Sequence, residues 1–288
     1  MRRIYGSVLF TVLGLSITAQ QNDFEKYGPF NAAVETDLKV IFKEKTAKKV
    51  FKLDLNYQAG DSALYPRIGE LKELQALKLN GNGVSDYPKD FDKLTNLVYL
   101  GSFNNKLQSF PPNLKSYFNL MHLELQHTVI DSVPASIAYL NRLQVLRIGN
   151  TNDTLKLPNT LRYLRALKEL SIENCVLDSL PSEIFKIASL KYLFLSNTNT
   201  RLLSKHFENL PNLEVMVIEN NGLSNIPFDI YKAQKLRIIA LRGNKLNKIP
   251  DSISQLNNLS VLDLRGNPMS REEIEILRSL LPSCDVKF

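Results

Sequence analysis

The chain has 288 residues, of which 44% are hydrophobic, and it carries 36 Lys and Arg against 29 Asp and Glu for a formal net charge of +7. The basic residues are spread among acidic ones, whereas nucleic-acid-binding proteins usually gather them in a patch, so the composition argues against a nucleic-acid partner. Two cysteines and three histidines leave few residues for disulfide or metal chemistry.

Residues 1–20 have the pattern of a secretory signal peptide. Two arginines precede an apolar run over residues 4–17 that is too short and too interrupted to be a comfortable membrane span. Cleavage after Ala19 or Gln20 would leave a mature chain with 34 basic and 29 acidic residues, a net charge of +5, and no transmembrane segment. No cysteine lies near this site, which argues against a lipid-anchored lipoprotein. An uncleaved amphipathic start is the alternative.

Residues 21–49 are expected to form a helical N-terminal cap. Apolar side chains recur at helical spacing among charged residues between Asn31 and Lys49, namely Val34, Leu38, Ile41 and Phe42. Such a helix would shield the open end of the repeated units that begin at residue 50.

One pattern recurs over residues 50–269. An apolar ladder, followed three residues later by Asn, Thr or Cys, restarts every 23 or 24 residues, at Leu74, Leu97, Leu120, Leu143, Leu167, Leu190, Leu213, Leu236 and Leu259. A weaker copy starts at Val50 and has Gln58 at the polar position. Alternation within each ladder predicts one strand per repeat, and sequential stacking predicts a parallel sheet. The polar residue after each ladder is expected to satisfy backbone groups of an interior turn, and the prolines that follow fix an extended return path.

The repeat LxxLxLxxNxLxxLPxxIxxLxx resembles that of leucine-rich repeat proteins over about residues 50–270. The resemblance implies an α/β solenoid, a horseshoe with a parallel β-sheet on its concave face, extended, 3-10 or short helical segments on the convex side, and helical caps at both ends. Extracellular members from animals and plants commonly have cysteine-rich caps. This chain has none, which fits a bacterial secreted or envelope protein better.

Residues 270–288 are expected to close the other end. Ser270 and Glu273 form a capping box that opens a helix, and a short strand should follow Pro282, with Cys284, Val286 and Phe288 alternating. At about 4.8 Å per strand, Cys175 and Cys284 should lie roughly 20 Å or more apart, beyond disulfide reach. Both are expected to be buried free thiols.

The search for chemistry yields one weak candidate. His122 and Glu124 should point to the same side of a strand, with His127 at its end. A zinc site needs a third ligand, and the neighbouring strands offer Tyr99 and Arg147 instead. A metal-dependent enzyme at this cluster is therefore the weakest hypothesis, and no catalytic residue, cofactor or metal ligand is predicted. No phosphate loop, nucleophile elbow or HExxH motif is present.

The exposed side of the strands is the best functional candidate. The third, fifth and seventh positions of aligned repeats form columns on this face, and they predict an aromatic and charged zone of Tyr99, Phe103, His122, Glu124, Arg147, Glu169 and Glu173. An apolar zone follows, made of Tyr192, Phe194, Val215, Val217, Ile238 and Ala240. Contiguous exposed apolar area marks interaction sites, although valine in the third column is common in the family.

These residues predict a non-enzymatic, exported recognition module that binds a protein or peptide partner through the concave sheet. The compartment after export would be the periplasm, the cell surface or the medium. A glycan- or envelope-binding protein that uses Tyr99 and Phe103 on the same face is the alternative.

We expect the protein released by its native host to lack its first 19 or 20 residues, because the two arginines, the short apolar run and the polar exit match a cleavable leader. Intact-mass spectrometry of the exported protein measures this directly. A full-length mass would contradict the prediction.

Overall fold

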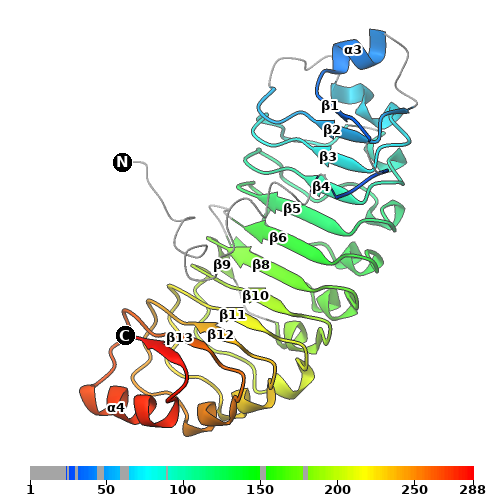
Figure 1. Ribbon diagram of the computed structural model, residues 1–288. Coiled ribbons are helices and arrows are strands. Elements are labelled where there is room, and N and C mark those ends of the chain that lie inside the picture. The colour runs from blue at the N-terminus through cyan, green and yellow to red at the C-terminus, as the bar shows by residue number, and fades with distance from the viewer. Residues whose placement is uncertain are drawn as a thin grey trace.

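The computed structural model describes residues 24, 26–29, 32–43, 49–58, 65–88, 90–149, 154–177 and 181–288. Across these residues the chain winds into a curved solenoid whose strands stack side by side in sequence order (Figure 1). The predicted signal peptide, residues 1–20, lies outside the described residues.

The main sheet has twelve parallel strands among the described residues, and successive strands come from successive repeats. Their order is β1 (Val34–Glu35), β2 (Lys52–Asp54), β3 (Ala76–Lys78), β4 (Tyr99–Gly101), β5 (His122–Gln126), β6 (Val145–Gly149), β8 (Glu169–Glu173), β10 (Tyr192–Phe194), β11 (Val215–Val217), β12 (Ile238–Ala240), β13 (Val261–Asp263) and β14 (Asp285–Lys287). A small second sheet pairs β7 (Thr154–Leu155) with β9 (Val176–Leu177).

The register of the sheet aligns the ladders as the repeat predicts. Leu193 lies beside Met216, and Met216 lies beside Ile239. All three side chains are fully buried. Because side chains alternate across a strand, the flanking third and fifth positions face the concave side, where they form continuous columns.

The convex side carries short 3-10 helices. They are η2 (Tyr65–Glu70), η3 (Phe91–Lys93), η4 (Leu114–Ser116), η5 (Ala135–Tyr139), η6 (Asn159–Tyr163), η7 (Ser182–Lys186), η8 (Phe207–Asn209), η9 (Phe228–Lys232) and η10 (Asp251–Gln255). Several follow directly on a proline with extended backbone, as at Pro134, Pro158, Pro181 and Pro250. Proline suits this place because it lacks an N–H and has a fixed φ. Repeat six has Ser204 instead, and its helix η8 is only three residues long.

A ladder of asparagines, of which Asn105 and Asn244 are buried, joins successive repeats at the predicted interior turn. Asn244 donates from Nδ2 to the carbonyls of Ile218 (2.6 Å) and Leu241 (2.9 Å), and its Oδ1 accepts from the amide of Leu223 (3.1 Å). Each such side chain therefore forms hydrogen bonds with backbone groups of its own repeat and of the preceding repeat. Equivalent bonds are made by Asn82, Asn105, Asn221 and Asn267.

The position before this asparagine has a left-handed backbone in repeat after repeat. Positive φ angles occur at Tyr57, Gly81, Asn104, His127, Asn174, Asn197, Asn220, Gly243 and Gly266. Glycine and asparagine tolerate this conformation best, and they fill most of the column. The run of Gly and Asn at this position is visible in the sequence and is a signal for the left-handed turn.

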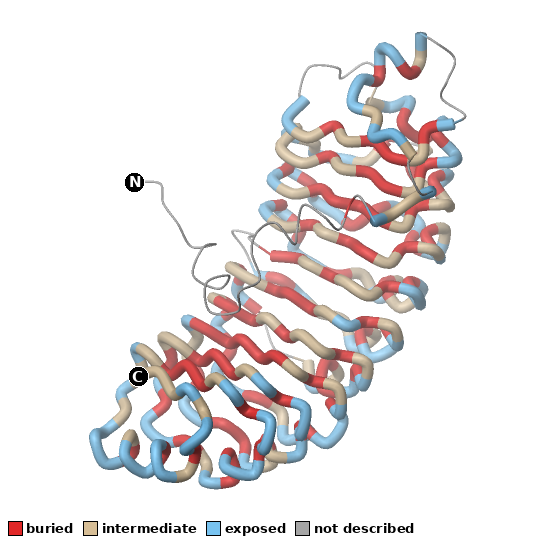
Figure 2. Tube along the Cα trace, in the orientation of Figure 1, coloured by how far each residue is buried: buried red, intermediate tan, exposed pale blue. Residues whose placement is uncertain are grey.

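The core is one continuous stack. Buried side chains run in a single cluster from Leu38 to Leu281, and every turn of the solenoid contributes buried positions to it (Figure 2). No repeat could bury these side chains alone, so the stability of the solenoid is shared between neighbours.

The N-terminal cap differs from the predicted long helix. Val34 lies in strand β1, which pairs with β2, and the described helix α3 covers only Leu38–Lys43, with Leu38 and Ile41 buried. Residues 44–48 lie outside the described residues. The edge of β2 offers unpaired backbone groups, and pairing with them outweighs the helical spacing of Val34.

The C-terminal cap confirms the Ser270 half of the predicted capping box, whereas the Glu273 side chain bonds the preceding repeat. The Ser270 hydroxyl accepts from the Glu273 amide at 3.1 Å, at the start of α4 (Arg271–Leu280). The Glu273 carboxylate accepts from the amide of Ile249 at 3.1 Å, so the helix is bonded to the preceding repeat. Strand β14 then pairs with β13.

Both cysteines are free, as expected. Burial raises the pKa of the Cys175 thiol to about 12 and that of Cys284 to about 11, although Cys284 is only half-buried. Among the described residues, no helix is both long and apolar enough to cross a lipid bilayer.

Asn244→Ala should lower the free energy of unfolding by about 1–3 kcal/mol, because the substitution leaves buried backbone groups without partners. Urea unfolding measures the change. Lys245→Ala, an exposed neighbour, is the control and should stay within about 0.5 kcal/mol of the parent. Equal losses in both variants would contradict the role given to the ladder.

Candidate functional site

The concave face carries the predicted columns in register. Tyr99, His122, Val145, Glu169 and Tyr192 follow one another along adjacent strands. The fifth positions do the same, through Glu124, Arg147, Ser171, Phe194 and Val217. The surface divides into three parts, which are an aromatic part over β3–β5, a charged part over β5–β8 and an apolar part over β10–β12.

The aromatic part is covered by the chain itself. Phe24 and residues 26–29, which we call the N-terminal strap, lie against the sheet face of β2–β5, and Figure 1 shows part of this dark-blue segment over β4 and β5. The Phe24 ring packs edge-on against Tyr99 with centroids 5.5 Å apart, and Tyr27 packs against the other predicted aromatic ring, that of His122, at 6.3 Å.

This cover removes two predicted site residues from the free surface. Tyr99 is 3% exposed and His122 is 1% exposed. Tyr99 lies over Gly101, where a Cβ would come within 2.8 Å of the Tyr99 hydroxyl, and that hydroxyl lies 3.3 Å from the Glu124 carboxylate. The expectation that both rings face solvent is therefore wrong, because repeat periodicity carries no information about a segment outside the repeats.

The charged part is paired within itself. Arg147 reaches Glu169 at 2.6 Å and Glu124 at 3.7 Å. Burial opposes ionisation of Glu124, but His122 and Arg147 outweigh it and hold the pKa of this carboxyl below its usual range. Because Arg147 is already paired with both carboxylates, a partner would gain little from this guanidinium.

The histidine cluster does not assemble. His122 Nε2 lies 3.8 Å from the Glu124 carboxylate, whereas His127 sits in a left-handed turn with its ring 4.6 Å from that of Phe103. Burial lowers the pKa of His127. Among the described residues, no group of three or more His, Cys, Asp or Glu side chains is placed to hold a metal ion.

The apolar part is a small cluster of its own, separate from the main core. Val215, Val217 and Ala240 are buried under the half-buried side chains of Tyr192, Phe194 and Ile238. Val217 is 1% exposed, so its predicted exposure is wrong. Neighbouring side chains on a curved sheet converge and cover the smaller ones, and the accessible apolar area belongs to Tyr192, Phe194 and Ile238.

Buried carboxylates border this cluster. Burial raises the pKa of Glu173, although the Ser171 hydroxyl donates to its carboxylate at 2.9 Å. Burial and the nearby Asp263 raise the pKa of Glu219, and Arg242 and Arg265 only partly compensate. The seventh column is therefore a polar rim beside the apolar cluster.

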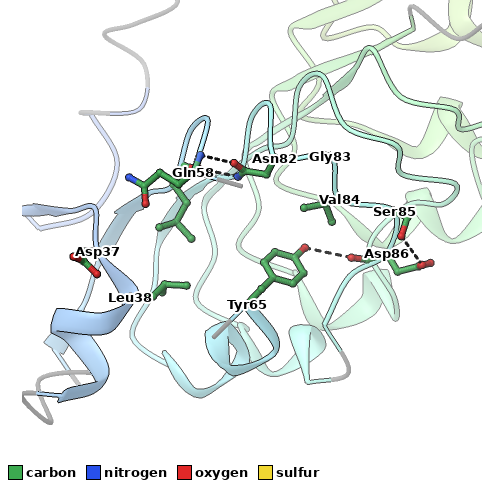
Figure 3. A pocket seen from close by; sticks show the side chains of 10 residues that line it. Asp37, Leu38, Gln58, Tyr65, Asn82, Gly83, Val84, Ser85 and Asp86 are labelled. Carbon is green, nitrogen blue, oxygen red and sulfur yellow. Dashed lines mark hydrogen bonds between the residues drawn. The ribbon is translucent and has the colours of Figure 1, made fainter. Parts of the chain in front are cut away.

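A pocket of about 360 Å3 lies elsewhere, between α3 and the first repeats (Figure 3). Its polar groups already have partners. Asp37 accepts from the amide of Lys39 at 2.7 Å, the Tyr65 hydroxyl donates to the carbonyl of Asp86 at 3.3 Å, and Asn82 accepts from the amide of Gln58 at 2.7 Å. The Asp37 bond is local to the start of α3, and the other two bonds join the first two repeats to one another.

Sequence comparison supports the repeat pattern. The family model described as "Leucine rich repeat" matches residues 165–223 and 211–269. The flightless-1 homolog of Caenorhabditis elegans is 27% identical over 102 residues, which is 34% of this chain and 8% of that protein. The chain thus spans only a small part of this curated relative.

Solved structures share the fold. An internalin from Listeria monocytogenes is 20% identical, with a TM-score of 0.73 over 88% of this chain and 71% of that chain. The Arabidopsis receptor kinase HAESA, in complex with the peptide hormone IDA and the co-receptor SERK1, is 24% identical, with a TM-score of 0.64 over 76% of this chain and 39% of that chain. At such identities the likeness shows the fold alone.

Glu219→Gln should stabilise the protein more at neutral than at acidic pH. The raised pKa of Glu219 means that the folded state holds its proton more tightly than the unfolded state. Stability is therefore lost as pH rises above the ordinary carboxyl range. Urea unfolding at about pH 4 and about pH 7 tests this. Glu275→Gln, an exposed substitution on α4, is the control, and a gain for Glu219→Gln that does not depend on pH would contradict the assignment.

Proposed function

We propose that this leucine-rich repeat protein is an exported, non-enzymatic recognition module that binds a protein or peptide partner on its concave sheet. The observation that carries the proposal is the cluster of Tyr192, Phe194 and Ile238, half-buried on the face of the sheet opposite the core. These side chains contribute less to the stability of the fold than the side chains of the main core. Tyr and Phe are also favoured anchors of protein interfaces.

The aromatic and charged parts of the concave face are less suited to a partner than the apolar part. The aromatic part lies under the strap, and Arg147 is neutralised by Glu124 and Glu169. A partner therefore gains most over β10–β12, where the half-buried Glu173 and the buried Glu219 border the cluster. Phe103, which is half-buried, becomes a secondary contact in this proposal, whereas Tyr99 and His122 lie under the strap.

The comparisons favour a peptide or protein ligand over a sugar. HAESA, which has the same fold, is solved with a peptide hormone. The glycan alternative relied on Tyr99 and Phe103 as stacking platforms, and Tyr99 is covered. Export rests on the leader sequence, and the solved repeat proteins supply only the fold.

Phe194→Asp should weaken binding of a captured partner by roughly 2 kcal/mol or more, the scale of an interface hot spot. The folded state should persist, because Phe194 lies outside the core cluster. The immobilised mature protein captures a partner from envelope or host extracts, mass spectrometry identifies it, and calorimetry compares the variants.

Two matched substitutions serve as controls. Leu195→Asp buries a charge at a fully buried position and should unfold the protein. Leu202→Asp makes the same chemical change at a residue that is 68% exposed outside the strands and should leave binding unchanged. Normal binding by folded Phe194→Asp would place the site elsewhere.

A further inference from the structure

The N-terminal strap sits in a site shaped for aromatic side chains. Phe24 is 2% exposed and packs on Ala76 and Tyr99, in a cluster separate from the main core. The Lys78 ammonium lies 4.3 Å from the centre of the Phe24 ring, a geometry in which the cation is attracted to the ring face.

The second ring has its own contacts. Tyr27 lies 5.6 Å from Tyr99 and 6.3 Å from His122, measured between ring centroids. The Tyr27 amide donates to the Phe24 carbonyl at 3.3 Å, so one turn of the strap directs both rings at the sheet. Beyond them, a Cβ at Gly28 would lie 3.0 Å from the Lys52 side chain, and φ there is +93°, so glycine lets the strap pass close to the sheet.

The strap packs outside the core of the repeats. Its rings lie on the outer face of β3–β5, whereas the inward ladder there, Leu77, Leu100 and Leu123, belongs to the main core. The surface under the strap is built from residues whose positions are fixed by strand register.

We propose that the concave sheet surface over β3–β5 is a binding site for an extended segment with Phe and Tyr three residues apart, and that the chain's own strap occupies it as a reversible, tethered ligand. The site lies apart from the Phe194 cluster and does not depend on the function proposed for that cluster. A partner with the same aromatic spacing would bind by displacing the strap, and displacement would expose Tyr99 and His122.

The test supplies the strap in trans. A fluorescein-labelled peptide with the sequence of residues 21–30, QNDFEKYGPF, is titrated against the full chain and against the double variant Phe24→Ala and Tyr27→Ala, with fluorescence polarisation as the readout. The double variant should bind the peptide at least about tenfold more tightly, because in the parent chain the tethered strap competes at an effective concentration in the millimolar range.

Two controls define the site. A peptide with alanine at both aromatic positions should not bind. Lys78→Ala, added to the double variant, should weaken binding several-fold, since it removes the cation over the Phe24 ring. Equal affinity for the parent and the double variant, or no binding to a double variant with an unchanged thermal transition, would overturn the proposal. If the double variant does not fold, Phe24→Ala and Tyr27→Ala are tested singly, and binding no tighter than to the parent overturns it equally.

Discussion

The asparagine side chain at the interior turn of five repeats, Asn82, Asn105, Asn221, Asn244 and Asn267, makes the interaction on which the rest of the structure depends. A strand that ends inside the solenoid leaves buried carbonyl and amide groups, and water cannot reach them. Asn244 satisfies three such groups from two repeats at once. The bonds fix both the turn and the offset between neighbours, and the offset sets the sheet register. Every column on the concave face follows from that register.

The ladder is weaker in the middle of the chain, where backbone pairing takes its place. Thr128 makes only one long bond, 3.4 Å to the carbonyl of Leu125, and Cys175 is a poor donor. In this region strands β5, β6 and β8 are five residues long, and β7 and β9 add a second pairing nearby. Repeats that lack the asparagine side chain thus have longer strands, and backbone hydrogen bonds between these strands join the neighbouring repeats.

The repeats could be read from the sequence because their cause is periodic. Local sequence rules predict the ladders from Leu74 to Leu259 and, through their spacing, the register of β10–β12. A local rule also predicts the Ser270 cap. The short α3 helix could not be predicted, because pairing of Val34 with the edge of β2 is a tertiary choice. For the site, the columns were predictable, but the burial of Val217 depends on curvature that brings its neighbours over it.

The strap is the largest difference between the structure and the sequence-based prediction. Its position is explained by the sheet face that the columns form. An inner sheet face that presents Tyr99, His122 and Phe194 exposes aromatic and apolar area to water, at a cost of about 25 cal/mol per Å2. Over β10–β12 the side chains reduce this cost by packing on one another. Over β3–β5, Gly101 and Ala76 are small, and Tyr99 lies over Gly101. Phe24 and Tyr27 pack against Tyr99 there. A surface that needs an aromatic cover in the free protein is complementary to aromatic side chains, whether they come from this chain or from another.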